Sequence, residues 1–161
     1  MTKYSVLPTW PFLLFGVVEP ALLIAGYITN LRDPAKYLHD QAPHLSSTPV
    51  SHLTQQALSV TLQLGNVLLL LALLAFVCTW THHPDTVKRY LLVLALADIG
   101  HVYASYFALG DDYFWNPPTW NATAWGNIGA SVFLNLNRWL TLAGLFGVVG
   151  GRKASHAKRA K

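Results

Sequence analysis

The chain has 161 residues, of which 53% are hydrophobic and only 11% are charged. Soluble domains carry about a quarter charged residues, so this composition, with four apolar runs of spanning length, indicates one integral membrane domain. The net charge of +4 does not indicate nucleic-acid binding, because five of the eleven basic residues lie in the last ten positions. A basic tail beside anionic lipid is the simpler interpretation. The single cysteine, Cys78, excludes a disulfide framework.

The first apolar run covers residues 9–29 and contains Glu19 followed by Pro20. It is long and lacks a small-residue cleavage site, so we expect a membrane span and not a signal peptide. Pro20 has no backbone N–H and crowds the carbonyl of Gly16, which predicts a kink beside Glu19. A polar loop over residues 30–53 follows, with a short interfacial helix expected at residues 34–40.

The second span is predicted over residues 54–80. Its first half carries polar side chains at spacings of three, four and three, which places them on one helical face: Gln56, Ser59, Gln63 and Asn66. Its second half is rich in leucine and suits contact with lipid.

The third span is predicted over residues 87–109, where Asp98, His101 and Ser105 share a face. An aromatic, proline-containing connection over residues 110–123 is typical of the membrane interface. The fourth span is predicted over residues 124–149. Its polar residues are spaced four, four and three: Asn127, Ser131, Asn135 and Arg138. Two small residues that suit close helix packing follow them, Gly144 and Gly147.

The distribution of Lys and Arg predicts that both termini and the turn at residues 82–88 face the cytosol. The polar stripes then fall in the half of the bundle away from the cytosol, and we expect a pocket reaching from mid-depth toward the lumenal side. We predict a four-span domain over residues 1–151 and a basic cytosolic tail over residues 152–161. The terminal KRAK resembles a dibasic retrieval signal and favours the endoplasmic-reticulum membrane. A glycosylation sequon is present at Asn121, but it lies too near the membrane to be a strong acceptor.

The predicted fold is therefore all-α, a membrane four-helix bundle around a polar pocket at mid-membrane depth. Glu19 and Asp98 are the acidic residues that lie inside spans, and Arg138 is the basic residue that lies well inside one. Such groups are costly in hydrocarbon unless they are paired or face a water-filled cavity. One interpretation is an arginine–carboxylate tie that locks the helices. The other is acid–base chemistry, because one arginine cannot neutralise two carboxylates and the surplus carboxyl is expected to keep its proton near neutral pH.

Other chemistries have weaker signals. His101 lies one turn from Asp98 and is predicted to hydrogen-bond it. Glu19, Asp98 and His101 could form a facial metal triad, but no HExxH motif accompanies them, and we expect no metal and no cofactor. Asp111 and Asp112 precede aromatic residues instead of a further carboxylate, which disfavours a diphosphate–magnesium site.

The chain resembles the EXPERA type of small four-span proteins, which includes the emopamil-binding sterol isomerases and the sigma-2 receptor. It resembles more closely small fungal membrane proteins found beside polyketide and terpenoid pathways. The resemblance covers all four spans and implies a pocket for a lipophilic molecule, with carboxyls that protonate an alkene or an epoxide. The residues that carry it are Glu19-Pro20, Gln63-x-x-Asn66, Asp98-x-x-His101 and Asn135-x-x-Arg138.

We therefore expect a membrane-embedded acid–base enzyme that opens an epoxide, by hydrolysis or cyclisation, in a lipophilic secondary metabolite. A double-bond isomerase and a non-catalytic lipid or sterol receptor are the alternatives, and a proton-coupled transporter is disfavoured by the leucine-rich half of the second span. Which carboxyl is the acid stays open, as does the oligomeric state, a homodimer included. The expected catalytic residues are Glu19, Asp98, His101 and Arg138, and the expected substrate-binding residues are Gln63, Asn66, Asn135, Ser105 and Ser131.

Overall fold

The structure is a computed structural model that describes residues 3–45 and 53–151. All regular secondary structure in these two ranges is helical, as predicted. The α-helices are α1 (Thr9–Leu13), α2 (Glu19–Arg32), α3 (Pro34–His39), α4 (Gln55–Thr79), α5 (Pro84–Phe114), α6 (Ala122–Ala124) and α7 (Ser131–Leu142). Two π-helical segments, Leu14–Val18 and Trp125–Ala130, and two 3₁₀ turns, Pro43–Leu45 and Pro117–Thr119, complete the set.

Within residues 3–45 and 53–151, three helices are long and apolar enough to cross a membrane: Thr9–Arg32, Gln55–Thr79 and Pro84–Phe114. Their positions agree with the first three predicted spans. The fourth predicted span is helical only from Ala122 to Leu142, is divided into α6, a π-helical segment and α7, and is not among these three. Its polar residues, Asn135 and Arg138 among them, lower its hydropathy and weaken the membrane signal.

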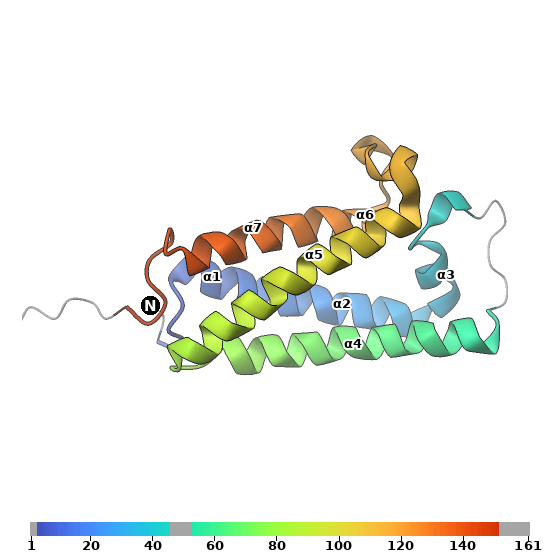
Figure 1. The fold of residues 1–161 in the computed structure, drawn as a ribbon. Coiled ribbons are helices and arrows are strands. Elements are labelled where there is room, and N and C mark those ends of the chain that lie inside the picture. Colours follow the sequence, from blue (N-terminus) through green and yellow to red (C-terminus); the bar gives the residue numbers. More distant parts are fainter. Residues whose placement is uncertain (1–2, 46–52, 152–161) are drawn as a thin grey trace, which may run out of the picture.

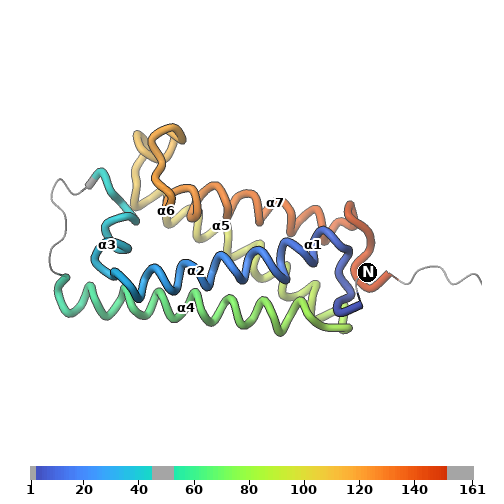
Figure 2. The backbone as a smooth tube through the Cα atoms, turned by 180° about the vertical axis from the view of Figure 1, so that it is seen from behind, coloured from blue at the N-terminus to red at the C-terminus, as the bar shows by residue number. Residues whose placement is uncertain are grey.

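The long helices run beside one another as two packed pairs, α2 with α4 and α5 with α7 (Figures 1 and 2). The N-terminal segment, the α4–α5 turn and the end of α7 lie together at one end of the molecule, and α3 lies at the other. Two backbone hydrogen bonds hold the first end together, from Val6 to Thr81 and from Gly150 to Val6. Residues 3 and 151 therefore lie at the same end, which is the geometry that the predicted orientation requires.

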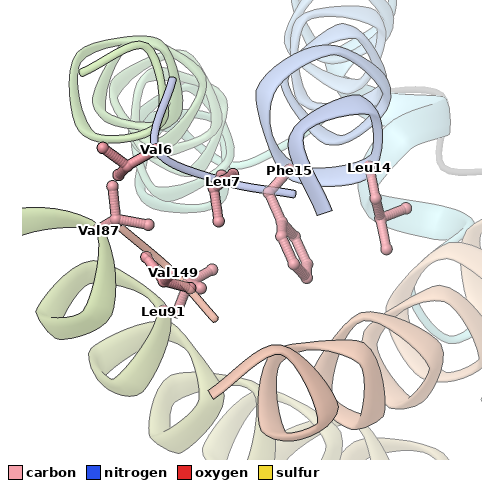
Figure 3. Packing of buried hydrophobic residues seen from close by; sticks show 7 residues of the cluster. All are labelled: Val6, Leu7, Leu14, Phe15, Val87, Leu91 and Val149. Carbon is pink, nitrogen blue, oxygen red and sulfur yellow. The ribbon is translucent and has the colours of Figure 1, made fainter. Parts of the chain in front are cut away.

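An apolar cluster fills this end of the molecule (Figure 3). It joins the N-terminal segment to the first turns of α5 and to the segment after α7. Burial of such side chains contributes about 25 cal/mol per Å² of apolar surface removed from water. The cluster consists of Val6, Leu7, Leu14, Phe15, Val87, Leu91 and Val149.

Beside Glu19, where the sequence predicts a kink, the structure has the π-helical segment Leu14–Val18, which ends where α2 begins. Pro20 cannot donate a backbone hydrogen bond to Gly16, and the Trp80 indole Nε1–H donates to the Gly16 carbonyl instead, at 2.8 Å. The proline thus frees a carbonyl that a side chain from the end of α4 satisfies. This bond fixes the turn from which Glu19 emerges.

The α2–α4 contact depends on a glycine. The buried Asn30 of α2 donates to the Thr61 carbonyl of α4 at 2.8 Å, and its side chain lies directly against Gly65. A Cβ on Gly65 would stand only 2.6 Å from the Asn30 Oδ1 atom. Gly65 therefore permits the close approach of the two helices at this level.

The glycines that follow α7 do not serve helix packing, so this prediction was wrong. Gly144 and Gly147 have φ angles of 81° and 108°, which L side chains rarely adopt. The Gly144 amide donates to Thr141 and the Leu145 amide to Leu140, the hydrogen-bond pattern of a Schellman motif that ends a helix. Gly144 thus ends α7 at Leu142, where we had expected the helix to continue to Val149, and Gly147 lies in the turn that follows.

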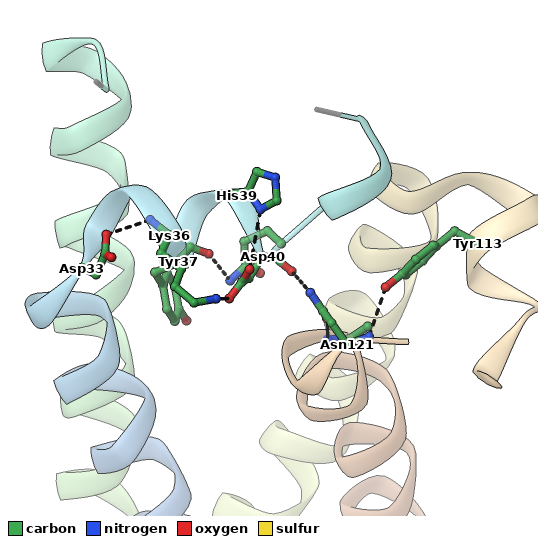
Figure 4. Close-up of polar contacts among 9 residues, drawn as sticks. Asp33, Lys36, Tyr37, His39, Asp40, Tyr113 and Asn121 are labelled. Atoms are coloured by element: carbon green, nitrogen blue, oxygen red, sulfur yellow. Dashed lines mark hydrogen bonds and ion pairs between the residues drawn. The ribbon is translucent and has the colours of Figure 1, made fainter. Parts of the chain in front are cut away.

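A polar network gathers at the α3 end of the molecule (Figure 4). Asp33 caps α3 by accepting from the Lys36 amide, and the Lys36 side chain binds Asp40, a hydrogen bond that raises the pKa of Lys36. The Asn121 amide donates to the Asp40 carbonyl at 3.0 Å and accepts from the Ala124 amide at 2.8 Å. Both ends of this side chain are therefore engaged, and glycosylation of the sequon would have to release them.

Candidate functional site

Arg138 stands between the two carboxylates that the sequence places inside spans. Its guanidinium donates through one terminal nitrogen to Glu19 Oε1 and through the other to Asp98 Oδ2. The three residues come from α7, α2 and α5, so the cluster joins three separate helices. The side chains of Arg138 and Glu19 are 1% and 7% exposed, and that of Asp98 is 15% exposed. Asp98 is thus the most open member of the cluster.

The cluster lies well inside the helical region. Glu19 is ten residues after Thr9, about 15 Å along a helix that rises 1.5 Å per residue. That distance is about half the thickness of a bilayer hydrocarbon core, roughly 30 Å. The hydrogen bonds of Arg138 bring Asp98 to the same region.

Two neighbours support the arginine and one of the carboxylates. The Phe15 ring lies one turn before Glu19, and its centroid is 5.3 Å from the Arg138 Cζ atom, a cation–π geometry. Asn135 donates to the Ala95 carbonyl of α5, and its side chain lies close enough to Asp98 to interact with the carboxyl group. A cation held by a ring and two carboxylates is well fixed in place.

Three buried polar atoms at or near this cluster have no hydrogen-bond partner among the described residues: Glu19 Oε2, Arg138 Nε and the Tyr90 hydroxyl. Tyr90 lies two turns before Asp98 on α5 and is close enough to interact electrostatically with Glu19, Arg138 and Asp98. Buried polar groups are normally paired. Free acceptors and donors beside a charged cluster are the arrangement expected where a small molecule is bound or transformed.

The structure brings together four of the predicted site residues: Glu19, Asp98, Asn135 and Arg138. His101 is near enough to interact electrostatically with the Asp98 carboxyl, but its side chain is exposed, and that carboxylate is hydrogen-bonded to Arg138 instead. Two predicted serines lie elsewhere on the same helices. Ser105 donates to the His101 carbonyl of its own helix, and Ser131 is half-buried at the start of α7.

Gln63 and Asn66 face away from the cluster, contrary to the prediction. The face of α4 that is buried against α2 carries Thr61 and Gly65, and both amide side chains are exposed on the opposite face. Gln63 bonds only Ser59 of its own helix, at 3.4 Å. A stripe of polar residues identifies one side of a helix but does not say what that side contacts. Asn127 likewise lies outside the cluster, bonded to Gln41 at 2.8 Å.

Three residues near the cluster were missed by the sequence analysis: Phe15, Tyr90 and Asn137. Phe15 and Tyr90 precede the two carboxylates by one and two turns, and that periodicity was the available signal. Asn137 is buried and accepts from the Trp10 indole at 3.0 Å, which ties α7 to α1. It was passed over because it falls off the stripe drawn through Asn135 and Arg138.

The facial metal triad does not assemble. Across residues 3–45 and 53–151, no three side chains of His, Cys, Asp or Glu gather closely enough to hold a metal ion. The two carboxylates are instead directed to one guanidinium. The chemistry that this arrangement suits is the movement of protons among carboxyl groups.

Replacing Tyr90 by Phe is expected to leave the free energy of unfolding unchanged or to raise it by up to about 1 kcal/mol, because the buried hydroxyl has no partner to lose. Tyr113→Phe is the matched control. The Tyr113 hydroxyl accepts a hydrogen bond from the backbone N–H of Asn121 at 3.1 Å, so removal of this hydroxyl should lower the free energy of unfolding by about 1 kcal/mol. Unfolding of both variants in mixed micelles measures the difference. A larger loss of unfolding free energy for Tyr90→Phe than for Tyr113→Phe would contradict the conclusion that the Tyr90 hydroxyl has no hydrogen-bond partner among the described residues.

A family model described as "Domain of unknown function (DUF7704)" matches residues 4–148, which include every residue of the cluster. No curated protein and no solved structure matches the chain. The matched segment covers far more than half of the sequence and all of the long helices. The chain therefore belongs to the DUF7704 family.

Proposed function

We propose that this protein is a membrane-embedded acid–base enzyme that opens an epoxide in a lipophilic metabolite. The observation that carries the proposal is the pair of carboxyl groups, from two different helices, that share one buried guanidinium. In the full proposal, the segment Ala122–Leu142 also crosses the bilayer and completes a four-helix bundle, in the endoplasmic-reticulum membrane with both termini in the cytosol. The substrate would enter from the lipid.

The charge balance of the cluster supports this chemistry. Two ionised carboxylates and one guanidinium would leave a net negative charge in a buried site, which is costly. A proton on either Glu19 or Asp98 makes the cluster neutral. The protein would then hold a carboxylic acid beside a carboxylate, the combination that general acid–base catalysis requires.

In the proposed reaction, each of the two carboxyl groups transfers one proton. The protonated carboxyl donates its proton to the epoxide oxygen as the C–O bond breaks. Water, or a hydroxyl group of the substrate, attacks the carbon, and the other carboxylate accepts the proton that the nucleophile loses. Hydrolysis yields a diol and cyclisation yields a cyclic ether bearing a new hydroxyl. In both, the net protonation of the two carboxyls is unchanged.

The surrounding side chains fit supporting roles. Arg138 would hold the ionised carboxylate throughout, and Asn135, which lies close to Asp98, would orient that group. The free Oε2 atom of Glu19 and the Tyr90 hydroxyl are available to bond the substrate oxygen or the nucleophile. Gln63 and Asn66 have no part in this site because they face outward.

Turnover by carboxamide variants tests the proposal. Microsomes containing the protein are incubated with a panel of epoxidised lipophilic substrates, and products are followed by mass spectrometry. Glu19→Gln and Asp98→Asn should each lower the rate by about 10²–10⁴-fold, because an amide neither donates nor accepts the proton in the transition state. Asp112→Asn is the matched control, since Asp112 is exposed and lies outside the cluster.

The outcomes separate catalysis from its alternatives. Two folded variants that retain full activity would show that the cluster is a structural tie and would end the proposal. Tight retention of a lipid or sterol by the wild-type protein, with no product from any substrate, would favour a non-catalytic receptor instead. Migration of a double bond without epoxide opening would favour an isomerase.

A further inference from the structure

We infer that the exposed face of α4 is the interface of a parallel homodimer in the membrane. This face, called here the outward seam, follows the whole helix at alternating spacings of three and four residues. It begins with polar side chains and ends with aliphatic ones. Its members, all exposed, are Gln56, Ser59, Gln63, Asn66, Leu70, Leu73 and Val77.

The outward seam lies opposite the face that α4 already uses. The contact with α2 and with the π-helical segment before it is made by a second series at the same type of spacing, running from Thr61 through Gly65 to Thr79. At 100° per residue, Gln63 and Asn66 point roughly opposite to that series. The helix therefore carries two seams, and α2 covers one of them.

The exposure of the outward seam is costly in a bilayer. Gln63 and Asn66 lie about 12 Å and 16 Å along α4, well inside the hydrocarbon region of a spanning helix. The contact of Gln63 with Ser59 uses only part of the hydrogen-bonding capacity of its amide. Leu70 and Val77 are 52% and 70% exposed, but aliphatic side chains cost nothing against lipid, so the cost lies in the polar half of the seam. Amides at this depth are stabilised by bonding to another helix.

A second copy of this chain is the partner that fits. Two copies inserted in the same orientation place each seam residue at the depth of its counterpart, so amides meet amides and leucines meet leucines. Amide side chains both donate and accept, which makes the polar half complementary to itself. The seam contains no charged residue that would repel a copy.

The spacing also fits a helix pair. Alternating spacings of three and four residues form a continuous seam that two helices crossing at a small angle can bury, and the parallel orientation follows from insertion of both copies in the same direction. Amides within such a seam fix the register and the number of helices. The residues of the Arg138 cluster belong to α2, α5 and α7, so dimerisation would not depend on the proposed chemistry, and either idea can fail alone.

Cysteine cross-linking in native membranes tests the interface. The full chain carries Cys78→Ala to remove its only cysteine, and single cysteines are then placed on α4. Leu70→Cys, Leu73→Cys and Val77→Cys should form disulfide-linked dimers on oxidation. Leu64→Cys and Phe76→Cys are the matched controls, because both positions are exposed on α4 but lie off the seam. Equal cross-linking at controls and seam, or linkage only to a different protein, would overturn the inference.

Energy transfer between labelled chains in vesicles provides the second measurement. The double variant Gln63→Leu with Asn66→Leu should weaken the dimer by about tenfold, since interhelical amide bonds in membranes are individually modest. Both substitutions lie on an exposed face and should not disturb the fold. Leu64→Ala should leave the dissociation constant unchanged. Equal constants for wild type and the double variant, or transfer no greater than that of unassociated chains, would overturn the inference.

Discussion

Arg138→Met is expected to lower the free energy of unfolding by about 3–5 kcal/mol at neutral pH, the usual cost of removing one partner from a buried ion pair. The substitution leaves Glu19 and Asp98 buried near each other without their shared cation. It also removes the bonds through which α7 holds α2 and α5. Unfolding in mixed micelles, followed by circular dichroism, measures the loss.

The reason for that loss can be tested separately from its size. Adding Glu19→Gln and Asp98→Asn to Arg138→Met should recover much of the lost stability, because no unpaired charge then remains in the interior. Lowering the pH should have a similar effect on Arg138→Met alone, since protons neutralise the two carboxylates. A deficit that is the same at every pH and in the triple variant would mean that lost packing, and not charge, causes it.

Gly65→Ala is expected to destabilise the protein by about 1–3 kcal/mol through overpacking of the α2–α4 contact. The new Cβ would stand 2.6 Å from Asn30 Oδ1 and 2.9 Å from Asn30 Cγ. Asn30 is fully buried and bonded to the Thr61 carbonyl, so it cannot move aside without losing that bond. The free energy of unfolding in mixed micelles measures the effect.

Gly100→Ala is the matched control for this substitution. Gly100 also lies within a long helix, but a Cβ there meets nothing within 4 Å. The free energy of unfolding of Gly100→Ala should be unchanged or rise by up to about 1 kcal/mol, because alanine favours the helix. Asn30→Ala combined with Gly65→Ala should cost less than the sum of the single changes, since the clashing atoms are gone. Strict additivity would contradict the proposed clash.

Much of the helical structure follows from local rules. Thr54 is a good N-cap and accepts from the Ala57 amide, so α4 begins at Gln55, one residue after its predicted start. Pro84 occupies the first position of α5, where a missing N–H costs nothing. The irregularity at Glu19 follows from Pro20. These features depend on residues within a few positions of one another.

The limits of the pattern analysis are visible on α4. The residues around Gln63 were recognised correctly as one face, but the face was assigned to the interior. Both sides of α4 have the same spacing, and only the packing of Asn30 against Gly65 shows which one α2 covers. His101 lies near Asp98, but no hydrogen bond joins these two described side chains, because the arginine reaches that carboxylate from another helix.

By itself, the sequence predicted an all-helical chain with four apolar spans, of which the first three are confirmed as helices long and apolar enough for a membrane, and it placed two acids and one arginine deep inside these spans. Hydrophobic content, proline positions and side-chain periodicity are local properties, so they can be read from the sequence without knowing how the helices pack. Only the tertiary structure decided which polar face turns inward and that Arg138 binds both Glu19 and Asp98. Those partners lie 119 and 40 residues away along the chain, and such pairings depend on how whole helices pack.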